Sequence, residues 1–69
     1  MVKYTDGKYI YYVSALLGNK KYAVCKKEIG SKNFGNHKYK SSANKTVQTE
    51  GEAQDYLDRL AERKGWQEY

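Results

Sequence analysis

The chain has 69 residues, a formal net charge of +5 and one cysteine, and these figures exclude several classes of protein. A chain of this length buries only about 60% of the surface that its unfolded form exposes, so we expect one small domain, residues 1–69, without room for a large enclosed active site. Cys25 alone can form neither an internal disulfide nor a cysteine-based zinc site. The longest apolar stretch, residues 9–17, has about half the length of a membrane-spanning helix, so no membrane partner is expected.

The same features indicate where the protein works. A lone cysteine within an apolar run is typical of a reducing compartment. The N-terminus lacks the basic, apolar and small-residue segments of a secretory signal. We therefore expect a soluble protein in the cytoplasm.

The charge is unevenly distributed along the chain. Residues 20–45 carry eight lysines and a single carboxylate, Glu28, for a formal charge of +7. Residues 46–69 carry six carboxylates and three cations, for a formal charge of −3. Such a polarised chain favours an anionic partner for its basic middle.

A β-hairpin is predicted in the first half of the chain. Residues 8–17 are mostly aromatic, β-branched or apolar in both alternating sets, which indicates a strand that is central or covered on both faces. Gly18-Asn19 can form a two-residue turn, and residues 21–29 then pair back as a second strand. The first half of that strand should be buried, and the second half, from Lys26, should be exposed. Because both faces of the hairpin are apolar, the sequence leaves open which face meets the helix.

The middle of the chain is predicted to contain a third strand. Residues 30–36 are rich in Gly, Ser, Asn and Lys and form a loop anchored by Phe34. Residues 36–41 can form the strand. Residues 42–45 form a turn, and residues 46–48 are either a short fourth strand or the extended lead into a helix.

Residues 50–64 carry the clearest signals of a helix. Thr49 followed by Glu52 matches the capping box. Gly65 can adopt the left-handed conformation that ends a helix, and Trp66 can fold back on the last turn. The apolar stripe that should face the sheet consists of Ala53, Tyr56, Leu57, Leu60 and Ala61;.

Together these elements predict an α+β fold with the order β-β-β-α. An antiparallel sheet of three or four strands, over about residues 3–48, packs against one C-terminal α-helix, over about residues 50–64. No internal repeat or linker interrupts the chain, which agrees with a single domain.

Catalytic and metal-binding sites find no support in the sequence. His37 is the only histidine, and its neighbours do not include a recognisable nucleophile, base and orienting acid;. One histidine and one cysteine provide only two good metal ligands. No glycine-rich phosphate-binding loop occurs. We therefore expect no enzymatic activity, no bound metal and no cofactor.

Lysines interleaved with tyrosines are the most informative feature. Lysines can neutralise phosphates, and tyrosines on a sheet face can stack on unpaired bases. The candidate nucleic-acid-binding residues are Lys21, Tyr22, Lys26, Lys27, Lys32, Lys38, Tyr39 and Lys40. The alternative interpretation is structural, because tyrosine is favoured in strands and lysine protects sheet surfaces and edges from aggregation.

Two short segments carry a family resemblance. Residues 6–12, Asp-Gly-Lys-Tyr-Ile-Tyr-Tyr, and residues 49–57, Thr-Glu-Gly-Glu-Ala-Gln-Asp-Tyr-Leu, resemble the first strand and the helix start of the arm-type DNA-binding domains of phage and transposon tyrosine recombinases. In that family a three-stranded sheet lies in the major groove. The resemblance implies DNA contacts by Lys21, Lys26, Lys27, Lys38 and Lys40. The chain departs from the family because it has no arginine before Arg59 and a longer second connection.

A second resemblance lies at the end of the helix. The glycine and aromatic residue there are similar to those of WGR-type nucleic-acid-associated domains, whose Trp-Gly-Arg signature is missing here. Both resemblances imply a nucleic-acid partner, and we expect a free-standing module.

Two functional hypotheses follow. The first is a small, basic, non-enzymatic module, from a phage or another mobile element, that binds DNA or RNA through a lysine- and tyrosine-rich sheet face. The alternative is a protein-interaction or inhibitor module that docks on an acidic protein or on a second copy of itself. In the latter case the acidic helix of one copy faces the basic sheet of another.

Overall fold

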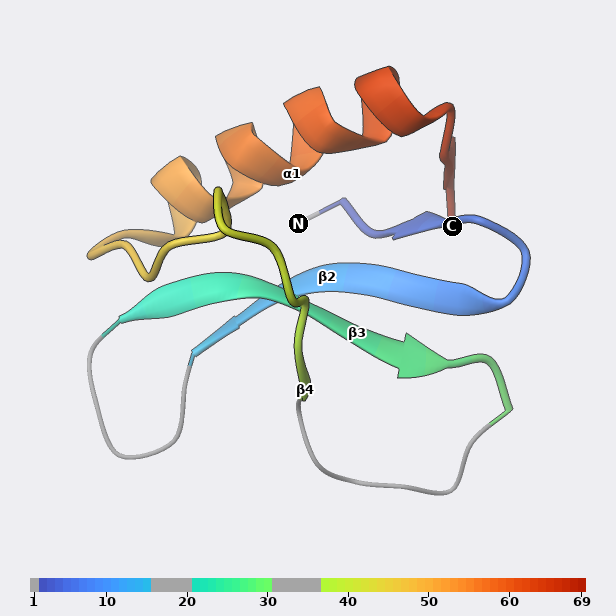
Figure 1. Ribbon diagram of the computed structural model, residues 1–69, viewed down its shortest axis with the longest axis horizontal. Coiled ribbons are helices and arrows are strands. Elements are labelled where there is room, and N and C mark those ends of the chain that lie inside the picture. Colours follow the sequence, from blue (N-terminus) through green and yellow to red (C-terminus); the bar gives the residue numbers. More distant parts are fainter. Residues whose placement is uncertain (1, 16–20, 31–36) are drawn as a thin grey trace.

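The computed structural model describes residues 2–15, 21–30 and 37–69. In this part of the chain a single helix covers one face of a five-stranded antiparallel sheet (Figure 1). The strands are β1 (Tyr4–Thr5), β2 (Tyr9–Ala15), β3 (Tyr22–Glu28), β4 (His37–Lys38) and β5 (Gln67–Glu68), and the helix is α1 (Glu50–Lys64). The order across the sheet is β4-β3-β2-β1-β5. The predicted α+β class, an antiparallel sheet with one C-terminal helix, is confirmed.

β2 and β3 form the centre of the sheet. They pair over their whole length, with Val13 opposite Val24. Residues 23–25 are buried and the strand is exposed from Lys27 on, which confirms the predicted change along β3. The predicted turn at Gly18-Asn19 lies outside the described residues.

Two short strands, β1 and β5, make the sheet wider than the three or four strands that we predicted. β1 pairs with β2, so Tyr4 lies opposite Tyr11. β5 follows the helix and pairs with the other side of β1, so Tyr4 also lies opposite Glu68. Strands of two residues are too short to show an alternating pattern, and the sequence therefore carries no signal for them.

The turn between β1 and β2 is organised by Asp6. Its carboxylate accepts hydrogen bonds from the N–H groups of Lys8 (2.9 Å) and Tyr9 (2.8 Å) and from the hydroxyl of Tyr11 (2.8 Å). Gly7 provides the positive φ, 96°, that the turn requires;. These hydrogen bonds hold the pKa of Asp6 below its ordinary value;. The bond from the Tyr9 N–H has the largest effect, and those from the Lys8 N–H and the Tyr11 hydroxyl have smaller ones.

This lowered pKa predicts a pH-dependent stability. The ionised carboxylate stabilises the folded state above the pKa of the unfolded chain, about 3.9, and this contribution is lost as the pH falls through the lower folded-state pKa. We expect Asp6→Asn to destabilise the domain at neutral pH and to matter less in acid. Urea unfolding of the natural protein and of Asp6→Asn, at neutral pH and at about pH 3, measures the difference in their free energies of unfolding. A difference that stays constant with pH would contradict this origin.

The main hydrophobic cluster lies between α1 and one face of the sheet, and Ile10, Ala23 and Cys25 are buried on the other face. The enclosed centre of the main cluster is formed by Tyr11 of β2, Val24 of β3 and Leu57 of α1. The partly buried side chains around it are Tyr4, Tyr9, Val13, Tyr39, Tyr56 and Trp66. The predicted helix stripe is confirmed, with buried Ala53, Leu57, Leu60 and Ala61 and half-buried Tyr56.

α1 is capped at the two predicted residues, and of the capping box the described hydrogen bonds include the Thr49 half only. The Thr49 hydroxyl accepts a hydrogen bond from the Glu52 N–H (3.2 Å). Gly65 has a φ of 76°, in the left-handed region;. The chain then turns back, and the Trp66 ring stacks on Tyr11 with ring centroids 3.7 Å apart and planes at 4°. Trp66 thus ties the end of the helix to the core and leads the chain into β5.

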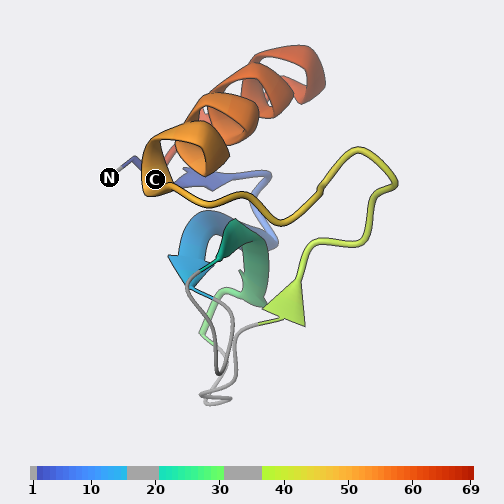
Figure 2. The ribbon, with the colours of Figure 1, turned by 90° about the vertical axis from the view of Figure 1, so that its left-hand side faces the viewer.

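The predicted third strand is shorter than expected. β4 has two residues, and Tyr39 adds one bond from its N–H to the Val24 carbonyl (2.9 Å). The chain then swings out from the sheet (Figure 2, yellow) and returns at Val47, which exchanges two hydrogen bonds with Tyr22 (2.7 and 2.8 Å). Of the two alternatives for residues 46–48, the structure shows the extended lead into the helix, held by a single bridge.

Candidate nucleic-acid interface

The pleat of β3 divides the predicted site residues between the two faces of the sheet. Residues directly opposite each other in antiparallel strands project to the same face. Lys26 lies opposite Tyr11, whose ring belongs to the core, so Lys26 is on the helix face. Tyr22 shares that face because side chains alternate along a strand. Lys27 lies opposite Ile10 and is on the other face.

The two tyrosines of the predicted site are half-buried on the helix face. Tyr39 is half-buried and meets Tyr11 and Trp66 edge-on, with ring centroids 5.6 and 5.9 Å away. Tyr22 is half-buried where β3 bonds to Val47. The sequence could not separate these positions from ligand-facing ones, because tyrosine suits a pleated strand whether its ring faces a ligand or the core.

Several lysines lie over tyrosine rings. The Lys26 ammonium is 4.7 Å from the centre of the Tyr9 ring, and the Lys8 ammonium is 5.5 Å from the same ring. On the other face the Lys27 ammonium is 5.9 Å from the centre of the Tyr12 ring. Each such contact contributes about 0.5–1 kcal/mol at an exposed site, so it orients the lysine without neutralising it.

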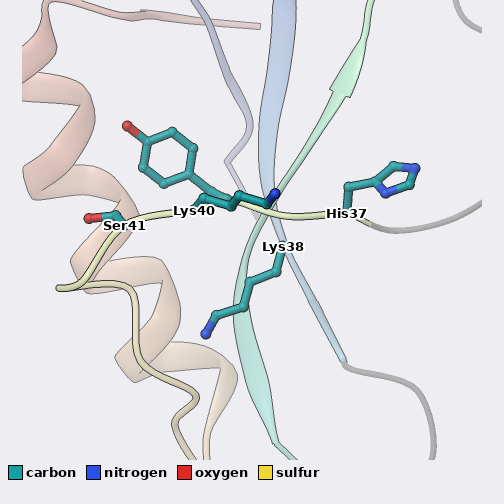
Figure 3. Close-up of a pocket in the computed structure, with 5 residues that line it drawn as sticks. His37, Lys38, Lys40 and Ser41 are labelled. Carbon is teal, nitrogen blue, oxygen red and sulfur yellow. The ribbon is translucent and has the colours of Figure 1, made fainter.

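A hollow of about 460 Å³ lies beside β4. It is lined by His37, Lys38, Tyr39, Lys40 and Ser41. Figure 3 shows His37 and Ser41 at the two ends of this segment, with Lys38 and Lys40 between them. Lys38 lies opposite Cys25 and therefore shares the face of Lys27;. We call the exposed lysines Lys27, Lys38 and Lys40 the lysine surface.

The remaining two predicted lysines, Lys21 and Lys32, are not part of the lysine surface. Lys21 precedes β3 and is exposed. Lys32 lies outside the described residues. Of the eight predicted residues, Lys38 and Lys40 therefore line the hollow, and Lys27 shares the sheet face of Lys38 on the neighbouring strand. Lys26, Tyr22 and Tyr39 lie toward the helix face.

Asn44 holds the segment that carries the hollow, and we did not predict it. Its side chain is buried, with an exposed fraction of 2%. Its oxygen accepts a hydrogen bond from the Val24 N–H (3.3 Å), and its amide nitrogen donates to the carbonyls of Val24 (3.0 Å) and Tyr39 (2.6 Å). The Asn44 side chain thus bonds to the backbone of Val24 in β3 where the segment after β4 has moved away from the sheet. We predicted a turn at residues 42–45, which include Asn44, because asparagine is common in turns and no local pattern shows a partner 20 residues away;.

Charge is segregated in space as well as along the chain. The three lysines of the lysine surface form no ion pair within the described residues. On the exposed side of α1, Asp55 pairs with Arg59 at 3.1 Å, and Asp58 accepts a hydrogen bond from the Tyr4 hydroxyl (2.8 Å). The positive charge of the lysine surface is therefore not compensated locally.

Cys25 lies among the lysines of this face without being a reactive thiol. Its side chain is fully buried. Burial raises the pKa of the thiol, and the nearby Lys38 ammonium only partly opposes this;. The thiol stays protonated at neutral pH and acts as a small buried side chain of the sheet face away from α1;.

No family model matches the chain, and no curated protein or solved structure matches it either. The resemblance to arm-type domains therefore stays a prediction. In the described ranges no three His, Cys, Asp or Glu side chains group as metal ligands. The helix of the described chain is too short and too polar to cross a membrane.

Proposed function

We propose that the protein is a small, non-enzymatic module that binds nucleic acid, with DNA as the first candidate, through the lysine surface. The observation that carries this proposal is a group of three exposed ammonium groups, Lys27, Lys38 and Lys40, that no carboxylate of the described chain neutralises. A lysine that contacts a phosphate releases counterions, so such a group provides affinity without any base contact.

The spacing of these lysines supports contacts with successive phosphates. Lys38 lies opposite Cys25, so Lys27 and Lys38 are diagonal neighbours on adjacent strands, about 7–8 Å apart;. One strand of duplex DNA presents about one charge per 3.4 Å of its axis, so a backbone that crosses these strands meets both lysines. Lys40 then extends the contact along the hollow.

Replacing Lys27, Lys38 and Lys40 together with glutamine tests the proposal. We expect the affinity for labelled duplex DNA at low salt to fall at least about tenfold. The slope of log K against log salt should become shallower by about 2–3, because each lost phosphate contact removes about 0.9 from it. Fluorescence anisotropy at several salt concentrations measures both. The three side chains are exposed, so the unfolding transition should change little;.

A matched control removes the same charge elsewhere. Lys3, Arg63 and Lys64 are exposed and lie outside the lysine surface, and their combined replacement by glutamine should leave most of the affinity. Equal losses in the two variants would show that total charge, and not this surface, is responsible. Absence of binding by the natural protein at low salt would contradict the proposal.

The protein-interaction alternative is favoured by one observation. The exposed carboxylates Asp55, Asp58 and Glu62 belong to α1, whereas Lys27 and Lys38 lie on the sheet face that α1 does not cover. An acidic protein, or α1 of a second copy, could therefore bind the same lysines. This alternative gains support if the natural protein fails to bind DNA at low salt.

A further inference from the structure

The exposed aromatic ring of the described chain lies away from the lysine surface. A protein that binds bases by stacking must present the face of a ring to its ligand. Of the nine aromatic side chains in the described ranges, Tyr69 alone is exposed (62%), and the others are buried or half-buried. Tyr69 follows β5, and β5 and β4 form opposite edges of the sheet. Its ring is therefore far from the hollow beside β4.

The half-buried rings nearest the lysines have neighbours already. Lys8 and Lys26 lie over Tyr9, and Lys27 lies over Tyr12. A base that stacked on either ring would first have to displace an ammonium group, which is the group that attracts phosphate. Tyr39, the aromatic residue of the hollow, is engaged edge-on with two core rings.

The hollow offers hydrogen-bond donors instead of ring faces. The ammonium groups of Lys38 and Lys40 donate and cannot accept. The Ser41 hydroxyl oxygen accepts a hydrogen bond from the Ala43 N–H (3.3 Å), which leaves the hydroxyl proton for donation to a ligand;. His37 adds a ring N–H at the other end. Phosphate oxygens only accept hydrogen bonds, so this set of donors matches them.

We propose that the lysine surface recognises the phosphodiester backbone alone, with the backbone lying along the hollow beside β4 and no base in contact. This inference rests on the proposed function and narrows its ligand to the phosphate chain that all nucleic acids share. Affinity then depends on phosphate density and not on base identity. A duplex should bind more tightly than a single strand of equal length, because its charges are closer together.

Single strands with and without bases test this inference. The probes are a labelled thymidine strand and a labelled strand of equal length in which every nucleotide is abasic, each titrated with the natural protein at low salt. We expect dissociation constants within about twofold of each other, because both strands carry the same phosphates. An abasic strand bound about tenfold more weakly would overturn the inference, since stacking would then supply affinity. That outcome would leave nucleic-acid binding itself intact.

Two further results complete the test. If neither strand nor a duplex binds, both this inference and the proposed function fail. A double variant, Lys38→Gln with Lys40→Gln, tests whether the backbone binds at the hollow. It should lower the affinity for the thymidine strand and for the abasic strand by the same factor. The control pair Lys3→Gln and Lys64→Gln removes equal charge outside the hollow and should have a smaller effect. Equal effects of the two pairs would contradict binding of the backbone along the hollow.

Discussion

Leu57→Ala is expected to destabilise the folded domain by about 2–5 kcal/mol. Leu57 is fully buried and packs with Tyr11 and Val24 at the centre of the core. Alanine would leave a cavity between the helix and the two central strands, because the surrounding rings are fixed by their own contacts. A domain of this size has a total stability of about 3–10 kcal/mol, so the variant should lie close to unfolding.

Thermal unfolding measures this effect. The fluorescence of Trp66, which stacks on Tyr11, reports on the same core. We expect the midpoint to fall by about 10–30 °C. Glu62→Ala is the matched control, because Glu62 is exposed on the same helix and its replacement should change stability by less than about 0.5 kcal/mol;. Similar midpoints for the two variants would show that Leu57 does not hold the helix on the sheet.

Asn44→Asp is expected to cost about 3 kcal/mol or more at neutral pH. A carboxylate can still accept the hydrogen bond from the Val24 N–H, but it has no proton to donate to the carbonyls of Val24 and Tyr39. It would place a buried negative charge against two carbonyl oxygens. Asn44→Ala removes all three bonds without adding a charge, at about 1–3 kcal/mol for each buried group left without a partner.

The pH dependence separates these two variants. Protonation in acid gives the aspartic acid one proton to donate, so the cost of Asn44→Asp should decrease relative to Asn44→Ala as the pH falls. Urea unfolding of both variants at neutral pH and at about pH 4 provides the comparison. Ser42→Ala is the control, because Ser42 is exposed in the same segment. If Asn44→Asp were as stable as the natural protein at neutral pH, the three hydrogen bonds would not be what holds the segment.

The helix could be predicted to its end residues because its signals are local. The Thr49 cap, the apolar stripe and Gly65 act through contacts between residues only a few positions apart;. β2 and β3 were recognised for a related reason, since β-branched and aromatic residues are dense in both segments. Such signals need no knowledge of the rest of the chain.

The edges of the sheet could not be predicted in this way. β1 and β5 are strands because each finds a partner, and the partner of β1 on one side lies more than sixty residues along the chain. The same holds for Asn44, whose side chain completes a ladder formed by β3 and the segment after β4. Neither feature leaves a pattern in its own segment.

The candidate site was predicted in part. The basic middle of the chain was evident from composition, but both alternating sets of β2 are largely apolar, so the sequence could not decide which set faces the helix. The packing of Tyr11 with Leu57 of α1 shows that the set containing Tyr9, Tyr11 and Val13 faces the helix. This choice sends Tyr22 toward the core and Lys27 to the opposite face.

By itself the sequence determined the fold class, the helix, the central hairpin strands and the separation of charge. These properties follow from local composition and periodicity, which short segments express independently. Only the tertiary structure decided the number of strands, the covered face of the sheet and the membership of the lysine surface. These depend on which distant segments pair, and pairing is fixed by the packing of the whole core.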